Sequence, residues 1–534
     1  MASAARRVFL IGCGPDELAG AAEELGFKAA NLLRLARLGV PVPPAFVLGT
    51  SWCRAFLDGG AALPEGTREQ LGAALRQLES ATGLAFGSAR RPLLVSVRSG
   101  APVSMPGMMD TVLDVGLGEA TLPGFIRLTG NPRLAWDSYR RLVESYAATV
   151  AGLDAAPFTA ARRAALATAG AATLQDLDYR ALRELTRAEL ALYRDAAGEP
   201  FPQAPLAQLE AAVAAVFASW NGARARWYRQ AHAIPDGLGT AVTVQQMVFG
   251  NGGGTSGAGV GFTRDPATGE PRLYLDYAPN AQGEDVVSGR AALGDVEPLT
   301  LLPVGIDTAL NELAQRLERE FHDVQEFEFT IEDGRLFVLQ TRTAKRAPLA
   351  ALRIAVELAE SGLIGAAEAR ARVAELDPAQ LVVTHLEGAD AAPLLATGIA
   401  ASAGVASGRV VFDPERASAR GAGGEPVILV REEVTTQDIA GIESAAGLLA
   451  ARGARTSHAA VVARQLEKVC LVGCEALSID QAARTIRLGS AQLSEGDVIS
   501  LDGNEGRVYI GRVRTQAERP RELLQRLARL RGPA

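Results

Sequence analysis

The sequence predicts a chain of several α/β and α+β domains. Its 534 residues correspond to about three or four domains of ordinary size. A hydrophobic content of 48% is sufficient to form their cores. Along the chain, the apolar residues change from β-rich runs to helical periodicity and back, which indicates alternating sheet and helix regions.

The bulk properties argue against several functional classes. A net charge of −7 makes nucleic acid and membrane surfaces poor partners. The four cysteines show no metal-site spacing, which fits a reducing cytoplasm. Residues 1–14 contain only a short apolar run, and no apolar stretch is long enough to span a bilayer, so we expect a cytoplasmic protein.

The N-terminal region is expected to form a strand, a helix and a second strand. Residues 8–11 are apolar, and a helix is predicted from Leu25 to about Leu38. The Gly39–Pro44 stretch ends this helix and leads into a strand at Ala45–Leu48. Lys28 lies close to the start of the helix.

A second β-rich run, Pro92–Gly100, carries Arg98 near its end. Arginine is permanently charged, and its planar guanidinium matches phosphate oxygens. A Pro-Gly pair then predicts a loop. The loop consists of Ser104, Met105, Pro106, Gly107, Met108, Met109, Asp110 and Thr111.

The middle of the chain is predicted to be helical at first and β-rich afterwards. Helical periodicity extends from about Leu122 to Trp227. From Gly239 the pattern is β-rich, and Gly250–Val260 predicts a glycine-rich turn between strands. No GxxxxGK[ST] motif occurs in the chain, which excludes a P-loop nucleotide site.

The segment 326–342 predicts a β-hairpin with an Asp-Gly turn. A two-residue turn would put Glu328 and Gln340 on opposite faces. We favour a three-residue loop, which places Glu328, Gln340 and Arg342 on one face. Such a group suits Mg²⁺ with a triphosphate, because this ion takes few protein oxygens and phosphate oxygens supply others.

His458 lies where a strand is expected to give way to a helix. The apolar run Ala446–Ala450 precedes it, and Ala459–Glu467 is predicted to be helical. Thr456 and Ser457 are of the residue types that cap helix N-termini. A helix N-terminus favours anions and disfavours an imidazolium, so we expect His458 to be neutral and nucleophilic.

Three of these segments resemble the pyruvate phosphate dikinase family, within the wider group of phosphoenolpyruvate-utilising enzymes. They are residues 25–32, 92–111 and 452–464; residues 280–287, which contain Glu284, and the hairpin 326–342 match the family as well, and the similarity extends from about residue 8 to about residue 515. The resemblance implies an ATP-grasp-type nucleotide-binding region with a helical subdomain, followed by a swivelling α/β phosphohistidine domain. The histidine would carry phosphoryl groups between two remote sites.

The resemblance also assigns roles to individual residues. His458 is the carrier, with Arg455, Thr456 and Ser457 as its neighbours. Nucleotide binding is assigned to Lys28, Arg98, Glu284, Glu328, Gln340 and Arg342, and Mg²⁺ binding to Glu328 and Gln340. The loop from Ser104 to Thr111 would fold over the transferring phosphoryl group.

Composition shifts and the resemblance together divide the chain into six segments. The first ATP-grasp lobe is 1–118, the helical subdomain 119–235 and the sheet lobe 236–346. A helical linker at 347–395, the phosphohistidine domain at 396–512 and a C-terminal helix and tail at 513–534 follow.

The sequence departs from the family pattern at four positions. Phe27 and Ala29 stand where the family has glycine, and a phenylalanine would crowd the approach of a phosphate. Ala454 replaces another glycine and would restrict a backbone turn. Arg455 replaces a methionine, and its charge would stabilise a pyrophosphoryl-histidine.

The resemblance implies ATP- and phosphate-dependent phosphorylation of His458 with Mg²⁺. Family members continue with a (β/α)8 barrel for pyruvate and phosphoenolpyruvate, whereas this sequence ends with a short leucine-striped helix that would pack on its own domain or dock a partner. We therefore expect a separate barrel protein as a partner, and a homodimer stays open. The alternatives are a related dikinase-type enzyme acting on another acceptor and a degenerate ATP-binding regulator.

Overall fold

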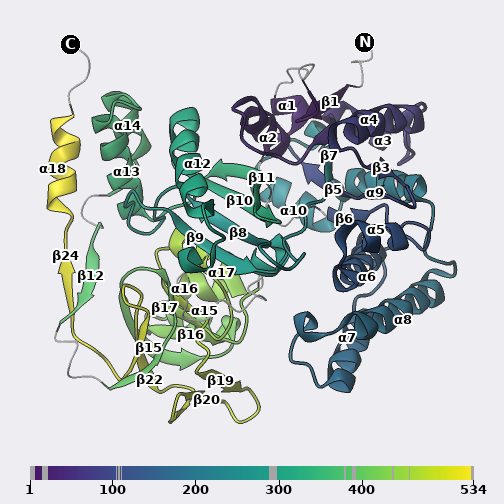
Figure 1. Ribbon diagram of the computed structural model, residues 1–534. Helices are drawn as coiled ribbons and strands as arrows, with labels where there is room; N and C mark the ends of the chain where they lie inside the picture. The colour runs from purple at the N-terminus through teal and green to yellow at the C-terminus, as the bar shows by residue number, and fades with distance from the viewer. Residues whose placement is uncertain are drawn as a thin grey trace. The chain divides into compact units, whose positions relative to one another are not determined.

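The protein divides into two compact units, which are described here one at a time from a computed structural model (Figure 1). The first unit comprises residues 1–252 and 337–340, and the second comprises 253–336 and 341–534. The structure describes residues 7–14, 22–103, 105, 109, 111–287, 298–377, 381–387, 393–435, 438–455 and 457–530.

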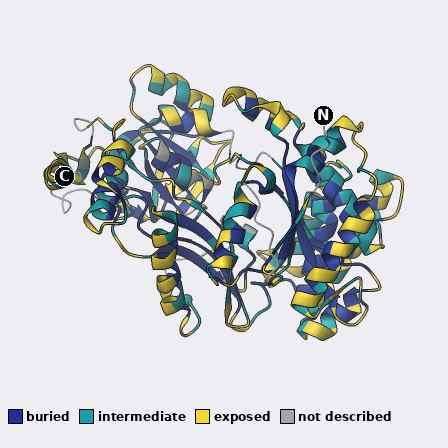
Figure 2. Ribbon diagram, turned by 90° about the horizontal axis from the view of Figure 1, so that it is seen from above, coloured by how far each residue is buried: buried dark blue, intermediate teal, exposed yellow. Residues whose placement is uncertain are grey.

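An antiparallel five-stranded sheet forms the centre of the first unit, in the order β1-β2-β7-β5-β6. The strands are β1 Val8–Ile11, β2 Ala45–Leu48, β5 Val95–Gly100, β6 Thr111–Val115 and β7 Ala241–Gln246. The helices around its N-terminal part are α1 Ala22–Leu25, α2 Phe27–Arg37, α3 Thr50–Asp58 and α4 Thr67–Thr82, with the short pair β3 Ala85–Phe86 and β4 Pro92–Leu93. Phe46, Trp52 and Val97 are buried in one shared core, because the apolar faces of these helices cover the sheet. The strands and the inner faces of the helices are accordingly the buried parts (Figure 2).

Six helices follow β6, and this is the helical stretch that the sequence predicts. They are α5 Leu122–Thr129, α6 Pro132–Thr149, α7 Ala156–Ala169, α8 Tyr179–Ala197, α9 Pro205–Ser219 and α10 Ala223–Ala231. Helix α6 begins with Pro132 after Asn131, whose side chain accepts a hydrogen bond from the Leu134 amide.

A network of buried charges lies between α6 and α8. Arg140 is 2% exposed and bonds both Asp137 (3.0 Å) and Glu144 (2.6 Å). The arginines beside Asp137 outweigh its burial and hold the pKa of this carboxyl far below its usual range. Glu189 on α8 is fully buried, and burial together with the nearby Glu144 carboxylate raises its pKa to about 9. Glu189 is therefore protonated at neutral pH.

The protonated Glu189 predicts a pH dependence of stability. In the unfolded chain this carboxyl releases its proton near pH 4, at about 4.3. The native state therefore binds an additional proton between that value and its own pKa of about 9, and stability falls as the pH rises through this window. Glu189→Gln keeps the shape of the protonated side chain and removes this dependence.

We expect the thermal unfolding midpoint of the wild-type chain to fall more steeply between about pH 6 and about pH 8.5 than that of Glu189→Gln. The control is Glu184→Gln, which changes an exposed residue on the same helix and should keep the wild-type slope. Equal slopes for all three proteins would show that Glu189 is ionised in the folded state.

The second unit begins with a four-stranded sheet in the order β11-β10-β8-β9. The strands are β8 Gly257–Phe262, β9 Tyr274–Pro279, β10 Gln325–Glu332 and β11 Arg335–Thr343, of which Phe337–Gln340 belong to the first unit. Its helices are α11 Gly283–Val287, α12 Ile306–Phe321, α13 Pro348–Glu360 and α14 Ala366–Arg372.

The glycine-rich segment is only partly a turn. Residues 250–256 connect the strands, but Gly257 and Gly259 already lie in β8. A Cβ at Gly257 would collide with the Tyr277 ring, and one at Gly259 with the Phe329 ring. These glycines are therefore needed because aromatic side chains of the neighbouring strands cross β8 closely.

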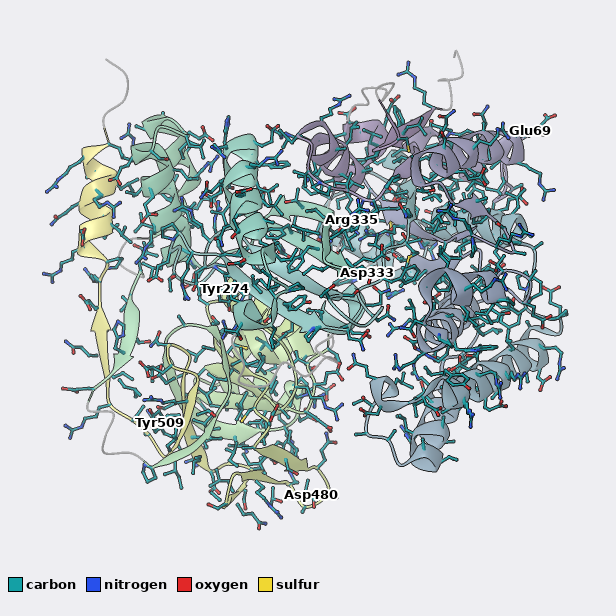
Figure 3. The ribbon with its side chains drawn as sticks, viewed as in Figure 1. Glu69, Tyr274, Asp333, Arg335, Asp480 and Tyr509 are labelled. Atoms are coloured by element: carbon teal, nitrogen blue, oxygen red, sulfur yellow. The ribbon has the colours of Figure 1, made fainter. Side chains whose placement is uncertain are left out.

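The β10–β11 hairpin corrects one prediction. Strand β10 ends at Glu332 and β11 begins at Arg335, with Asp333 (φ 48°) and Gly334 (φ 77°) between them (Figure 3). Two consecutive positive φ angles define a two-residue type I′ turn, so the expected three-residue loop is wrong. The Asp333 amide donates to Ser256 Oγ at 3.0 Å, which helps to hold the aspartate in the left-handed conformation.

An eight-stranded sheet organises the C-terminal part of the second unit, in the order β13-β23-β22-β15-β16-β17-β18-β14. The strands are β13 Leu394–Thr397, β14 Ile399–Ser402, β15 Val405–Val411, β16 Val427–Arg431, β17 Gly447–Ala450, β18 Val469–Val472, β22 Val498–Asp502 and β23 Arg507–Ile510. The four strands from β15 to β18 are parallel. Helices α15 Pro414–Ala422, α16 Ile439–Ser444 and α17 His458–Gln465 connect them. The small sheet β19 Leu477–Asp480, β20 Thr485–Leu488 and β21 Ala491–Ser494 is attached to this part.

The C-terminal helix packs on its own unit. Strand β12 Val383–Leu386 pairs with β24 Thr515–Glu518, and α18 Arg521–Arg529 follows. Leu523 joins an apolar cluster with Leu352 of α13, and Arg526 pairs with Glu360 at 2.6 Å. The leucine stripe is thus used within the chain. Across the described residues, no helix is both long and apolar enough to cross a membrane.

Candidate functional site

A cavity in the first unit brings together residues from four distant parts of the chain. About 250 Å³ of space free of protein atoms lies in it, part of which is open solvent. It is lined by Lys28, Ala29 and Leu32 of α2, Arg98 and Ser99 of β5, Thr243 and Gln245 of β7, and Leu339 and Gln340 of β11. Three of the predicted nucleotide-binding residues, Lys28, Arg98 and Gln340, therefore lie around one space.

Gly26 allows α2 to approach β5 closely enough to form this cavity. It is the N-cap of α2 with φ 76° and ψ 154°, a conformation open almost only to glycine. A Cβ at this position would collide with the carbonyl oxygen of Gly100. The Phe27 amide donates to the Ala101 carbonyl at 2.9 Å and closes the contact.

The two replaced glycines of this segment cause no backbone strain. Phe27 and Ala29 are both in α2, and neither has a positive φ. Ala29 is buried against the cavity, whereas Phe27 is not among the residues that line it. The position that requires glycine is Gly26, which this chain retains.

Arg98 is held by two glutamine amides. Its Nη1 donates to Gln245 Oε1 and its Nη2 to Gln340 Oε1, each at 3.4 Å. Gln245 is 2% exposed, and its Nε2 donates to the Pro43 carbonyl at 3.1 Å, which directs Oε1 toward the arginine. The two amides orient the guanidinium, and its planar donors match an anion with several oxygens, such as a polyphosphate.

Ser99, Thr243 and Gln245 were not predicted as site residues. Strand β7 places Thr243 opposite Arg98 and Gln245 opposite Ser96. Thr243 and Gln245 are two positions apart, so strand periodicity puts both side chains on one face. That periodicity is the signal in the sequence, but the neighbouring strand β5 is about 150 residues away in the chain.

In the second unit, Arg342 forms an ion pair with Glu326. Arg342 Nη2 lies 2.5 Å from Glu326 Oε1. Burial opposes the charge on Arg342, but Glu326, with a further contribution from Glu328, outweighs it and raises the pKa of the guanidinium. Glu326 was missed, although its spacing of two from Glu328 places both carboxylates on one face of β10.

The proposed magnesium ligands have suitable donor atoms. Glu328 and Gln340 offer a carboxylate and an amide oxygen, the hard donors that Mg²⁺ accepts. Nearby on β10, the buried Glu326 Oε2 has no hydrogen-bond partner among the described residues, which leaves another acceptor open. No cluster of three or more His, Cys, Asp or Glu side chains suited to a metal is found in the described part of the chain. The two-residue hairpin turn removes the argument that put Glu328 and Gln340 on one face, so their joint role as Mg²⁺ ligands stays a proposal that rests on the resemblance.

The histidine segment has the predicted strand–turn–helix form. Helix α17 starts at His458, one residue earlier than expected, and Ser457 caps it by accepting a hydrogen bond from the Ala460 amide at 3.4 Å. The positive φ of the turn, 131°, falls on Gly453. Ala454 has no positive φ and is buried, so the expected restriction at this position does not arise.

Arg455 contacts an aromatic ring. Its guanidinium lies 5.7 Å from the centroid of Tyr274, on β9 of the same unit (Figure 3 labels Tyr274). A cation over a ring face is attracted by the ring quadrupole. The structure thus gives Arg455 a contact that the sequence did not predict.

Several predicted site residues lie partly or wholly outside the description. Ser104, Pro106, Gly107, Met108, Asp110 and Thr456 are not among the described residues, and of Glu284 and His458 only the backbone is described, at the starts of α11 and α17. Met105 is buried in the core of the first unit, with Met109 packed against it. Thr111 begins β6 and pairs with Arg98 of β5.

Comparison with known proteins gives consistent matches for both units. Residues 60–296 match the family described as pyruvate phosphate dikinase, AMP/ATP-binding domain. Residues 423–506 match the mobile domain of PEP-utilising enzymes. Arg98, Thr243 and Gln245 fall in the first match, and His458 falls in the second.

Relatives that match most of this chain are named pyruvate, phosphate dikinase. The chain is 43% identical to a pyruvate, phosphate dikinase of Clostridium symbiosum over 498 residues, which is 92% of this chain and 57% of that protein. It is 42% identical to the enzyme of Rhizobium meliloti (strain 1021) over 531 residues, 95% of this chain and 58% of the relative. The chain therefore spans a little over half the length of these relatives. The expected resemblance to pyruvate phosphate dikinases is confirmed by these matches.

The close contact between α2 and β5 can be tested with two glycines at the ends of α2. Gly39 also has a positive φ (69°), but a Cβ there would meet nothing within 4 Å. Gly39→Ala should cost about 1 kcal/mol from the left-handed backbone alone. Gly26→Ala should cost at least about 2 kcal/mol more, because the backbone of Gly100 must move.

Urea unfolding measures the stability of both variants, and hydrogen exchange of the peptide that contains the Phe27 amide measures the local contact. We expect faster exchange in Gly26→Ala only. Equal losses of stability in the two variants would mean that the helix and the strand are not held at this separation.

Proposed function

We propose that the chain uses ATP and inorganic phosphate to phosphorylate its own His458, the nucleotide half-reactions of a pyruvate phosphate dikinase. The observation that supports this most strongly is the cavity in which Lys28 and the amide-held Arg98 converge. Arg98 lies in the stretch matched to an AMP/ATP-binding domain. The capped start of α17 at His458, within the match to the mobile domain, supplies the acceptor.

The reaction has two steps in this proposal. A nitrogen of the neutral His458 imidazole attacks the β-phosphorus of ATP, the bond to the α–β bridging oxygen breaks, and AMP leaves with that oxygen. An oxygen of inorganic phosphate then attacks the terminal phosphorus of the pyrophosphoryl-histidine. Pyrophosphate leaves, and His458 keeps the former β-phosphoryl group.

The side chains of the chain bind and orient the nucleotide. Lys28, Arg98 and Arg342 offset the charge of the phosphates, which is the main protein contribution in phosphoryl transfer. Glu284 would contact the nucleotide, and Glu328 and Gln340 would hold Mg²⁺, which when bound neutralises developing charge on the phosphates. The loop from Ser104 to Thr111 would cover the transferring group, and Arg455, Thr456 and Ser457 would be the neighbours of the histidine.

These proposed residue roles imply a domain architecture. In the proposed ATP-grasp-type region, residues 1–118 form the first lobe, 119–235 the helical subdomain and 236–346 the sheet lobe. The linker 347–395 lets the phosphohistidine domain 396–512 swivel between sites. Transfer to pyruvate would require a phosphoenolpyruvate/pyruvate-binding barrel in addition to these domains.

Labelled ATP tests the two half-reactions. With ATP labelled at the β-phosphorus, we expect label on His458 by mass spectrometry whether or not phosphate is present. With ATP labelled at the γ-phosphorus, the label should stay on the protein until phosphate is added and then appear in pyrophosphate. Arg98→Met should slow loading by about 10²-fold, whereas the exposed control Arg76→Met should not.

Other outcomes separate the competing functions. Transfer of label to water, which gives free phosphate, or to a sugar, without a requirement for inorganic phosphate, would identify a dikinase acting on another acceptor. ATP binding without any label on His458 would identify a non-catalytic regulator and refute the proposal.

A further inference from the structure

Arg464 connects the turn before His458 to a neighbouring strand. It lies on α17 six positions after the histidine and is 1% exposed. Its Nη1 donates to the carbonyl of Arg455 at 2.9 Å and to the carbonyl of Ala401, in β14, at 2.8 Å. One nitrogen atom therefore bonds two segments that are 54 residues apart in the sequence, 455 minus 401.

The rest of the guanidinium has an unusual environment. Nε and Nη2 are buried and have no hydrogen-bond partner among the described residues. The group lies 5.7 Å from the centroid of the Phe262 ring, on β8. Burying a guanidinium in this way costs several kcal/mol, on the order of the effective penalty for a buried ion. Packing alone does not account for an arginine here, because an apolar side chain would fill the space without this penalty.

Phe262 and Tyr274 form a common seat for the histidine segment. The two residues are directly opposite each other in β8 and β9, and their rings meet edge to face with centroids 6.0 Å apart. Arg464 lies over Phe262, and Arg455 lies over Tyr274. Both guanidinium groups come from the segment that carries His458, so this segment contacts the sheet through two cation–ring interactions.

We infer that Arg464 is a positioning residue for the phosphorylation of His458, and that the Phe262–Tyr274 pair is the surface that seats the histidine segment. Arg464 fixes the backbone at Arg455, at the end of the described segment from Gly453 to Arg455 that precedes the start of α17. The inference rests on the proposed function of His458 as the phosphoryl acceptor.

Within the described part of this segment, the Ser457 amide donates to the Ala454 carbonyl at 3.0 Å, and Arg464 adds the bonds that link the segment to β14. Gly453 has φ 131°, which glycine leaves readily, and the Arg455 carbonyl would lose its donor without Arg464. A displacement of about 1 Å at the reacting group is enough to cost about 10²-fold in rate. Arg464 would act through the turn, with no contact to the nucleotide required.

Three variants test the inference in the full chain. Arg464→Met keeps the length and apolar bulk of the side chain but removes the donor. Arg464→Lys keeps a charge and a donor able to reach a carbonyl oxygen. Arg487→Met changes an exposed arginine of the same unit and is the matched control.

We expect Arg464→Met to lower the rate of His458 labelling by β-labelled ATP by about 10²-fold, with the dissociation constant of ATP changed by less than about twofold. The labelling rate of Arg464→Lys should lie within about tenfold of the wild-type rate, and the rate of Arg487→Met should equal the wild-type rate. This split between rate and affinity, with rescue by lysine, would not arise from a general loss of stability.

Hydrogen exchange of the peptide 453–461 provides an independent readout. Arg464→Met should increase exchange there, and Arg487→Met should not. If Arg464→Met does not fold, Tyr274→Leu, which removes the ring under Arg455, takes its place and should show faster exchange in this peptide.

Wild-type rates and wild-type exchange in Arg464→Met would overturn the inference. If the wild-type chain is not labelled at His458, the proposed function fails, and the exchange experiment still decides whether Arg464 holds the turn.

Discussion

The contact between α2 and β5 is the constraint on which the cavity of the first unit depends. Gly26 has a backbone conformation that other residues rarely adopt, and it packs against the Gly100 carbonyl with no room for a side chain. The helix and the strand are thereby held at one separation. Lys28 from the helix and Arg98 from the strand can then line the same small cavity.

In both units, neutral oxygen acceptors orient an arginine side chain. Arg98 is held by the amide oxygens of Gln245 and Gln340, and Arg464 by two backbone carbonyls. A neutral oxygen orients a guanidinium and leaves its charge in place, whereas a carboxylate contact would cancel much of it. Arg342 differs, because Glu326 pairs with it directly. Amide and carbonyl oxygens thus orient Arg98 and Arg464, whereas a carboxylate orients Arg342.

Local sequence patterns predicted some of these features and missed others. The start of α17 followed from a serine cap after an apolar strand, and the structure confirms Ser457 in that role. The hairpin turn was mispredicted because Asp333 adopts a left-handed conformation, which a hydrogen bond from its amide to Ser256, 77 residues away, supports. Gln245 and Arg464 were missed for a similar reason. Their partners, Pro43 and Ala401, are 202 and 63 residues distant, and no local pattern indicates them.

The central claim is that ATP bound in this cavity transfers its β,γ-pyrophosphoryl group reversibly to His458. Exchange of labelled AMP into ATP, measured with the chain alone and without pyruvate, tests it most directly. The account predicts exchange in the wild-type chain and none in His458→Asn, because only a pyrophosphoryl-histidine can return its group to AMP. Exchange that persists in His458→Asn, or its absence in a wild-type chain that binds ATP, would contradict the account.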